Sequence, residues 1–228
     1  YFGKFDPDYD DGSKNGLHPL FAEVENDDIS DDPGSISIWA KGMSLVVDYL
    51  VSDSTVDQKR IIAIGHSRLG NTALWAAVND EWFAAAISNN SGCGGAALSR
   101  RKQGETVKKI NTSFPHWFCK NFHLYNEKEE DIPVDQHMLI GLIAPRPVYV
   151  ASANEDLLAD PEGEYLSLYH SGSVYSLFKL ENFGSETMPE IDESQTIGNM
   201  GYHIRSGKHD LTLFDWEKYM DFADVQFN

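Results

Sequence analysis

Three side chains of the types that cooperate in nucleophilic catalysis lie far apart in this chain: Ser67, Asp156 and His209. A serine hydroxyl becomes a nucleophile when a histidine takes its proton, and a carboxylate can hold that histidine in the required tautomer. The set therefore predicts acyl transfer, with Ser67 as nucleophile, His209 as general base and Asp156 as the acid that orients it.

The serine lies in Gly65-His66-Ser67-Arg68-Leu69-Gly70, between the apolar run 61–64 and the run 72–77. This pattern predicts a strand, a tight turn and a helix, the arrangement of a nucleophile elbow. The usual elbow has a glycine two residues before and two residues after the serine. Gly65 fits, but Leu69 occupies the second position, so a buried strand and helix with an incidental serine is the alternative reading.

The order nucleophile, acid, histidine is that of an α/β-hydrolase, with the acid after a late strand and the histidine after the last one. Asp156 follows the predicted strand 146–153, and His209 follows the predicted strand 199–205. Glu155 and Asp160 compete for the acid role, because a carboxylate a few residues away could also reach the histidine. Asp156 is favoured by its position just beyond the end of the strand.

Two other histidines receive structural roles. His66 lies inside the elbow, and we expect its side chain to point away from Ser67 and to pack. His137 is expected to form a structural hydrogen bond with Asp135.

The apolar periodicity predicts alternating helices and strands. We expect an α/β-hydrolase fold, with a mainly parallel sheet flanked by helices, in a single domain over residues 1–228. Residues 1–35 and 171–194 are predicted to be irregular, and 96–135 an insertion that shapes a pocket. The predicted helices are 36 to about 52, a helix containing 72–77, then 138–143, 162–168 and 213–225; the predicted strands are 61–64, 83–88, 146–153 and 199–205.

Composition limits the partners. The chain has 36 acidic and 18 basic side chains among 228 residues, a formal charge of −18, which argues against nucleic acid and anionic membranes as partners. Cys93 and Cys119 could form one disulfide or remain two free thiols, and the absence of a Cys-x-x-Cys pair argues against structural zinc. The acidic stretches before residue 35 could suggest calcium, but without EF-hand spacing they are interpreted as solvated loops. No metal or cofactor is predicted.

Five motifs stand out along the chain: residues 65–70, Ser91-Gly92-Cys93-Gly94-Gly95-Ala96-Ala97, Phe114-Pro115-His116-Trp117-Phe118, Pro133-Val134-Asp135-Gln136-His137 and Lys208-His209-Asp210. Together they resemble the bacterial glucuronoyl esterases of carbohydrate esterase family 15. The resemblance implies hydrolysis of the ester between 4-O-methyl-glucuronate of xylan and lignin alcohols, by a serine triad without metal, in a secreted or periplasmic enzyme that acts on plant cell walls.

By position, the resemblance implies that Arg68 stabilises the oxyanion, for which a permanently charged guanidinium is suited. Glu105 resembles the acid that contacts uronate hydroxyls, and Trp117 is expected among the substrate-binding residues.

The chain also departs from the family pattern. Asn90 stands where many members have a catalytic glutamate, while Asp156 matches the members that place the acid after the late strand. Two further expected substrate-binding positions are altered: Asn71 replaces a lysine and Leu158 replaces a tryptophan.

The family is longer at its amino end, so we expect a truncated chain whose first sheet strands would precede Tyr1. Two alternatives remain at this point. One is another carbohydrate esterase, such as an acetyl xylan esterase, and the other is a catalytically inactive carbohydrate-binding relative.

Overall fold

The computed structural model describes residues 5–11, 13–21 and 31–228. A five-stranded sheet in the order β1-β2-β3-β5-β4 forms its centre, and all neighbouring pairs are parallel except β4 with β5. The predicted α/β class and mainly parallel sheet are confirmed. The strands are β1 (Ile62–His66), β2 (Ala85–Asn89), β3 (Val148–Ala153), β4 (Ser194–Ile197) and β5 (Met200–Arg205).

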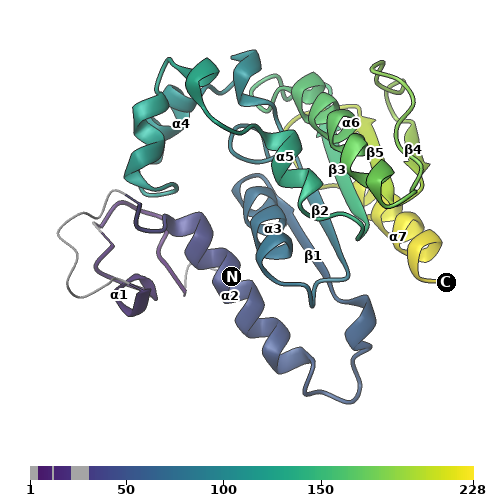
Figure 1. Cartoon of the computed structure of the whole chain (residues 1–228), viewed down its shortest axis with the longest axis horizontal. Coiled ribbons are helices and arrows are strands. Elements are labelled where there is room, and N and C mark those ends of the chain that lie inside the picture. Colours follow the sequence, from purple (N-terminus) through teal and green to yellow (C-terminus); the bar gives the residue numbers. More distant parts are fainter. Residues whose placement is uncertain (1–4, 12, 22–30) are drawn as a thin grey trace.

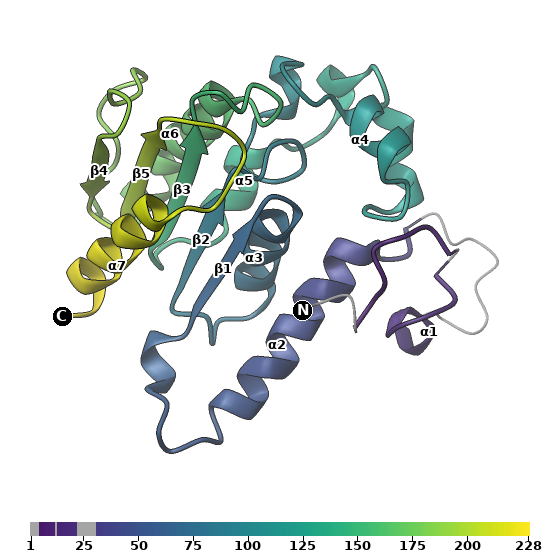
Figure 2. The same cartoon turned by 180° about the vertical axis from the view of Figure 1, so that it is seen from behind.

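Helices cover both faces of this sheet (Figures 1 and 2). Helices α3, α5 and α6 lie on one face and α7 lies on the other, while α2 packs against α3. The α-helices are α1 (His18–Phe21), α2 (Ser35–Leu50), α3 (Arg68–Asn79), α4 (Val107–Ser113), α5 (Gln136–Gly141), α6 (Pro161–Leu177) and α7 (Leu213–Phe227).

Strand β3 shows why this sequence forms a central strand. Successive side chains of a strand point to opposite faces. Val148 and Val150 belong to the core under α3 and α6, whereas Tyr149 and Ala151 pack under α7, and all six residues of the strand are buried. A continuous apolar run is what a strand covered on both faces requires.

Helix α6 and strand β4 differ from the predictions: α6 extends into the region 171–194 that was expected to be irregular, and β4 begins at the last residue of that region. Helix α6 continues to Leu177, although serines and a glycine lower its helix propensity, because Ser171, Gly172 and Tyr175 are buried in tertiary contacts that outweigh propensity. Strand β4 was missed because it is short, polar and at the sheet edge, where no apolar run is needed.

The insertion 96–135 forms α4 and several 3₁₀ turns, and it closes over a second core with α2. Within this core the α2 side chains Ile36 and Trp39 pack with Ile110 and Trp117. The insertion is thus fixed against the body of the domain beside the end of β1.

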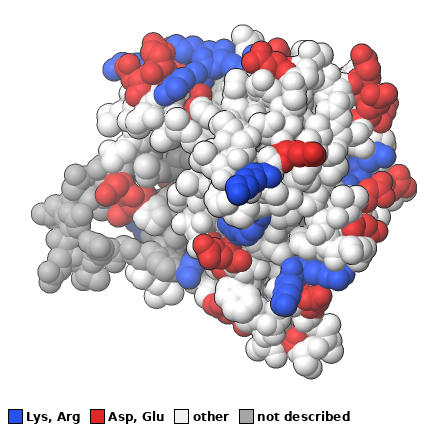
Figure 3. All heavy atoms as spheres, turned by 45° about the vertical axis from the view of Figure 1, so that its right-hand side comes forward, with Lys and Arg blue, Asp and Glu red and all other residues white. Residues whose placement is uncertain are grey.

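On the face shown in Figure 3, acidic side chains are interspersed with basic ones rather than gathered in one patch. No helix among the described residues has the length and apolarity needed to cross a membrane. Cys93 and Cys119 are both free thiols. The acidic residues 25–28 lie outside the described residues, and within the described ranges no group of three or more His, Cys, Asp or Glu could hold a metal ion.

Candidate active site

Ser67 sits on a strained corner between β1 and α3. Its backbone has φ 57° and ψ −135°, in the left-handed half of the map that residues other than glycine rarely occupy. The Ser67 N–H donates to the Asn89 carbonyl at 2.9 Å, and the Gly70 N–H donates to the Ser67 carbonyl at 2.7 Å. The corner therefore has the strained strand-to-helix form of a nucleophile elbow.

The unusual glycine spacing of the motif has a packing explanation. A Cβ at Gly65 would collide with the carbonyl group of Leu69, so the crossing of β1 and α3 requires glycine there. A Cβ at Gly70 would lie 2.8 Å from the Ser91 side chain and 2.9 Å from the Ser88 hydroxyl. The close approach to the neighbouring loop falls at Gly70, and Leu69 instead contributes to the second core.

The sheet brings the acid and the histidine together. Because β1, β3 and β5 are parallel, the residues that follow them meet at one edge of the sheet. His209 Nδ1 lies 2.6 Å from Asp156 Oδ2. Asp156 is buried and His209 is 43% exposed, so the imidazole can meet a substrate while the carboxylate stays behind it.

Electrostatics support this pairing. The hydrogen bond with Asp156 raises the pKa of His209 above its ordinary value, against the opposing effect of burial. Burial alone would raise the pKa of Asp156, but hydrogen bonds from His209 and Asn90 outweigh it and lower that pKa. Asn90 Nδ2 donates to Asp156 Oδ2 at 2.9 Å, so the residue in the glutamate position supports the aspartate that replaces it.

The competing acids are engaged elsewhere or lie outside the site. Asp160 caps α6 through the Gly163 N–H at 3.1 Å and pairs with Arg101 Nε at 2.9 Å. Glu155 is not among the residues that line the site pocket. The structure therefore brings Asp156, and neither of its two rivals, to the histidine.

Arg68 is held by Asp8, which lies in the amino-terminal region that the sequence analysis interpreted as solvated acidic loops. Its Nε lies 2.9 Å from Asp8 Oδ2, and its guanidinium lies 5.9 Å from the centre of the Trp117 ring. Asp8 Oδ1 also accepts from Trp117 Nε1 at 2.9 Å and faces His116 Nε2 at 3.0 Å. Sequence spacing gave no signal for this contact, because 60 residues separate the partners.

These groups open into one pocket of about 290 Å³. Three of the four expected substrate-binding residues line it, Glu105, Leu158 and Trp117. The full lining is Ser67, Arg68, Asn90, Ser91, Gly92, Glu105, Phe114, Trp117, Asp156, Leu158, Ala159 and His209.

Asn71 is the exception, because it does not line this pocket. It is 2% exposed, and its Nδ2 donates to the Cys93 carbonyl at 3.2 Å. Its place on the inner side of α3 gives it a packing role under the Ser91–Gly95 loop.

The two other histidine predictions have different outcomes. His66 packs as expected, but against the catalytic candidate: its ring centre lies 4.5 Å from that of His209, and its Nδ1 lies 2.6 Å from Asn89 Oδ1. The prediction of a hydrogen bond between His137 and Asp135 is wrong, because His137 Nδ1 is buried without a partner. Asp135 instead caps α5 and accepts from the Ser99 N–H at 2.8 Å.

One buried acid was missed entirely. Glu164 on α6 is fully buried and accepts from the Ser91 N–H at 2.7 Å, the Gly92 N–H at 3.0 Å and the Ser152 hydroxyl at 2.7 Å. Burial raises its pKa to about 8. A lone glutamate in a predicted helix gives little signal of such a role, yet this one fixes two residues of the pocket wall.

Known proteins with similar sequences are esterases, which agrees with the geometry of the site. The Carbohydrate esterase MZ0003 of an unknown prokaryotic organism is 48% identical over 225 residues, which are 98% of this chain and 52% of that protein. A 4-O-methyl-glucuronoyl methylesterase of Hypocrea jecorina (strain QM6a) is 33% identical over 139 residues, 57% of this chain and 30% of that protein. The chain thus spans about half, or less, of the length of the curated relatives it matches.

Solved structures are similar over the whole chain. The Glucuronoyl Esterase from Solibacter usitatus matches with a TM-score of 0.93 and 45% identity, covering 100% of this chain and 58% of its own. A promiscuous CE15 esterase from the marine bacterial metagenome matches with a TM-score of 0.91 and 47% identity, covering 100% of this chain and 57% of its own. The fold is the expected α/β-hydrolase fold. Since the family model for "Glucuronyl esterase, fungi" also matches residues 25–178, the chain belongs to the glucuronyl esterase family.

Proposed function

We propose that the chain carries the catalytic site of a serine esterase that hydrolyses the ester between 4-O-methyl-glucuronate of xylan and lignin alcohols. The observation that carries the proposal is the 2.6 Å contact between His209 and Asp156 at the mouth of the pocket that holds Ser67 and Arg68. Relatives named 4-O-methyl-glucuronoyl methylesterase support the uronate ester as substrate class.

The proposed reaction has two halves. His209 takes the proton of Ser67 as the hydroxyl oxygen attacks the ester carbon, and Asp156 stabilises the resulting imidazolium. The tetrahedral intermediate collapses to an acyl-enzyme, and the alcohol leaves with the proton from His209. Water then attacks the acyl carbon by the same route, which releases the uronic acid and restores Ser67.

Arg68 is proposed to stabilise the negative oxygen of both tetrahedral intermediates. Its side chain is 45% exposed at the pocket, and Asp8 holds Nε, leaving the terminal guanidinium nitrogens for the substrate oxygen. The amino end of α3 begins directly after Ser67 and adds a favourable dipole at the same point.

The uronate is proposed to lie between Glu105, Leu158 and Trp117. Burial raises the pKa of Glu105 above its ordinary value, while Lys109 opposes that effect. Its carboxyl can accept hydrogen bonds from sugar hydroxyls in either half of the reaction. Leu158 offers an apolar surface rather than an aromatic ring, so weaker sugar stacking is expected on that side.

The proposed setting is the degradation of plant cell-wall polysaccharide by a secreted or periplasmic enzyme. A polymeric xylan substrate must be met where the polymer is, outside the cytoplasm. The net charge of −18 supports a substrate other than nucleic acid or an anionic membrane.

The decisive assay compares hydrolysis of benzyl glucuronate by the wild type, Ser67→Ala and Ser52→Ala. Ser52 is exposed and bonds only to the Tyr49 carbonyl, so it serves as the matched control. We expect Ser67→Ala to lose at least about 10³-fold in kcat and Ser52→Ala to match the wild type. Equal rates in wild type and Ser67→Ala would refute the mechanism.

Two further measurements separate the alternatives. Faster hydrolysis of acetylated xylan than of benzyl glucuronate would favour an acetyl esterase. A folded protein whose Ser67 is not labelled by a serine-directed phosphonate would favour an inactive carbohydrate-binding relative.

A further inference from the structure

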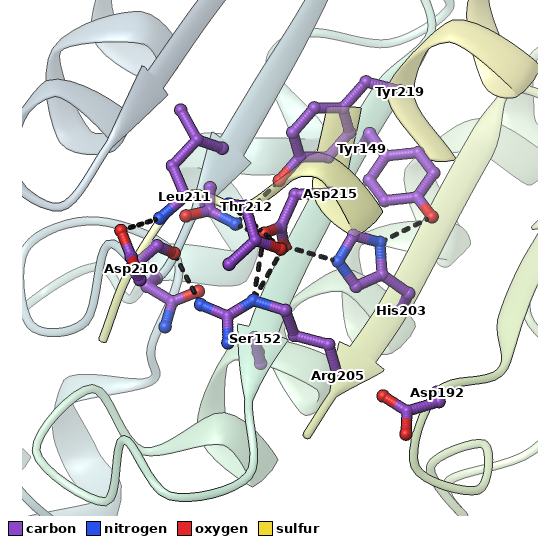
Figure 4. A network of polar contacts seen from close by, with 12 residues as sticks. Tyr149, Ser152, Asp192, His203, Arg205, Asp210, Leu211, Thr212, Asp215 and Tyr219 are labelled. Atoms are coloured by element: carbon purple, nitrogen blue, oxygen red, sulfur yellow. Dashed lines mark hydrogen bonds and ion pairs between the residues drawn. The ribbon is translucent and has the colours of Figure 1, made fainter. Parts of the chain in front are cut away.

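A buried guanidinium, that of Arg205, holds the turn that carries His209, and Figure 4 shows it bonded to both Asp215 and Asp210. Arg205, the last residue of β5, is 3% exposed. Its Nη1 donates to the Ser206 carbonyl at 3.0 Å, and its Nη2 donates to the carbonyls of Lys208 at 2.8 Å and Asp210 at 2.6 Å. Lys208 and Asp210 flank His209, so one side chain holds the backbone on both sides of the histidine.

The orientation of this guanidinium is set by Asp215. Arg205 Nε donates to Asp215 Oδ2 at 2.9 Å, and Asp215 is fully buried at the third position of α7. The same carboxylate oxygen accepts from the N–H and the hydroxyl of Thr212, both at 2.7 Å. The amino end of α7 thereby fixes the carboxylate, and the carboxylate fixes Arg205.

The other oxygen of Asp215 is connected to the His209 ring by a second route, through Asn89 and His66. Oδ1 accepts from Asn89 Nδ2 at 3.1 Å, and Asn89 Oδ1 lies 2.6 Å from His66 Nδ1. The His66 ring then packs against the His209 ring at 4.5 Å. The buried carboxylate is thus connected both to the backbone of the turn and to the ring beside the imidazole.

This arrangement exceeds what a stabilising ion pair needs. Replacing a buried ion pair by apolar groups of similar volume is often neutral for stability. A contribution to stability therefore does not by itself account for the Arg205–Asp215 pair. Here two of the three guanidinium nitrogens are spent on carbonyls of residues 206–210 rather than on the carboxylate. The rigid planar fork of arginine suits this use, because several donors are fixed by a single orientation.

We propose that Arg205 and Asp215 are positioning residues of the active site: they hold the 206–210 turn so that His209 keeps its hydrogen bond to Asp156 while it serves Ser67. The catalytic consequence rests on the proposed function. The structural consequence, the integrity of the His209–Asp156 hydrogen bond, can be measured without any substrate.

The first test uses Arg205→Met and Asp215→Asn. The His209 Nδ1 proton, shared with Asp156, should give a far-downfield proton NMR resonance in the wild type, assigned by its loss in Asp156→Asn. We expect both variants to lose or broaden it in a folded protein. On benzyl glucuronate, kcat should fall about 10- to 100-fold with KM changed less than about threefold, since misplacing a catalytic group by about 1 Å can cost 10²-fold.

The pH profile separates positioning from charge. The groups that act on His209 are the acids Asp156, Glu164 and Glu105, the cation Arg205 and the neighbouring His66. Removing the positive charge of Arg205 would by itself raise the pKa of His209, whereas losing the hydrogen bond to Asp156 would lower it. Positioning therefore predicts that the acid limb of kcat/KM moves to lower pH in Arg205→Met.

Arg146→Met is the matched control. The Arg146 guanidinium also donates to three backbone carbonyls, those of Ala77 at 2.6 Å, Phe83 at 2.8 Å and Asp80 at 3.2 Å. It precedes β3, at the sheet edge opposite the site. We expect this variant to lose thermal stability but to keep the resonance, kcat and the acid limb.

Arg205→Lys supplies the conservative variant, and it should recover part of kcat and of the resonance because an ammonium can still donate to carbonyls of the turn. If Arg205→Met and Asp215→Asn do not fold, the resonance of Arg205→Lys decides: an unweakened signal contradicts the proposal. Folded Arg205→Met with the wild-type resonance, or with an acid limb moved to higher pH, also overturns it. If the wild type hydrolyses no glucuronate ester yet Arg205→Met loses the resonance, the proposed function fails while the positioning role stands.

Discussion

Ser67 shows at the scale of one residue how the site is prepared. A non-glycine residue in such a conformation costs of order 1–3 kcal/mol, which the surrounding structure must offset. The offset comes from the fit beneath it, where Gly65 lets β1 and α3 approach and Gly70 lets α3 approach the Ser91 loop. The hydroxyl therefore stands at the amino end of α3 before any substrate arrives.

Asp156→Asn should lower kcat by about 10³- to 10⁴-fold, because an amide in place of the carboxylate favours the wrong tautomer of His209. Steady-state kinetics on benzyl glucuronate measure the loss. Asp160→Asn is the control, since Asp160 holds Arg101 and the start of α6 instead. It should keep kcat within about threefold, and the reverse pattern would transfer the acid role to Asp160.

The pH dependence of kcat/KM should reflect His209. Only the neutral imidazole can accept the serine proton, and the bond to Asp156 raises the pKa of His209. Activity should therefore rise with pH through an apparent pKa above 6.5. His66, whose pKa burial lowers, stays neutral over that range and adds no second limb. An acid limb centred below 6 would contradict the pairing.

Asp8→Asn should reduce kcat about 10-fold while KM changes little, because Arg68 loses the partner that aims its guanidinium at the oxyanion. The loss should be smaller than the 10²- to 10³-fold typical of deleting an oxyanion donor. Asp53→Asn is the control, as Asp53 is an exposed acid that accepts from the N–H and the hydroxyl of Thr55. Equal kcat in Asp8→Asn and wild type would show that Arg68 is oriented without Asp8.

At the scale of elements, the first turn of α6 supports the pocket wall. Glu164 reaches the backbone of Ser91 and Gly92, where the chain leaves β2. The loop needs these bonds because its N–H groups point into the protein, away from water.

Glu164→Leu should leave two buried N–H groups unpaired, at about 1–3 kcal/mol each, and should also lower kcat. Glu164→Gln keeps an acceptor for those groups and should stay close to the wild type at pH 7, where burial keeps Glu164 largely protonated with a pKa of about 8. Urea unfolding at pH 7 measures the difference. Equal destabilisation by both variants would show that the negative charge is required.

Glu164 also predicts how stability changes with pH. A carboxyl whose folded pKa is raised favours folding most below its unfolded pKa of 4.5 and loses that contribution as pH rises toward 8. The free energy of unfolding of the wild type relative to Glu164→Gln should therefore fall between pH 4.5 and pH 8. A difference that grows over this interval would contradict the raised pKa.

At the scale of the whole molecule, parallel pairing of β1, β2, β3 and β5 is the decisive feature. It places the residues after four strands at one edge, although Ser67, Asp156 and His209 are spread over most of the chain. The insertion 96–135 then closes one side of the pocket through Glu105, Phe114 and Trp117. The site is thus a product of the topology rather than of any local segment.

The sequence by itself determined the α/β class, the elbow at Ser67, and the late positions of Asp156 and His209. Each depends on local spacing, because strands need short apolar runs and helices need a three-to-four residue period. Three of the four expected pocket residues were also found from motif positions, while Asn71 was not a pocket residue, since its depth beneath the loop depends on packing.

Only the tertiary structure decided the contacts between distant polar groups. Three such contacts depend on side-chain length and burial, which no local sequence pattern indicates. They join Asp8 to Arg68, Glu164 to the Ser91 loop, and Arg205 to the His209 turn. The roles of Asp156 and Asp160 also depend on the tertiary structure. The sequence favours Asp156 by its position after the strand but leaves Asp160 as a competitor four residues away. The direction in which the turn after β3 points each carboxylate makes Asp156 the partner of His209 and Asp160 the cap of α6.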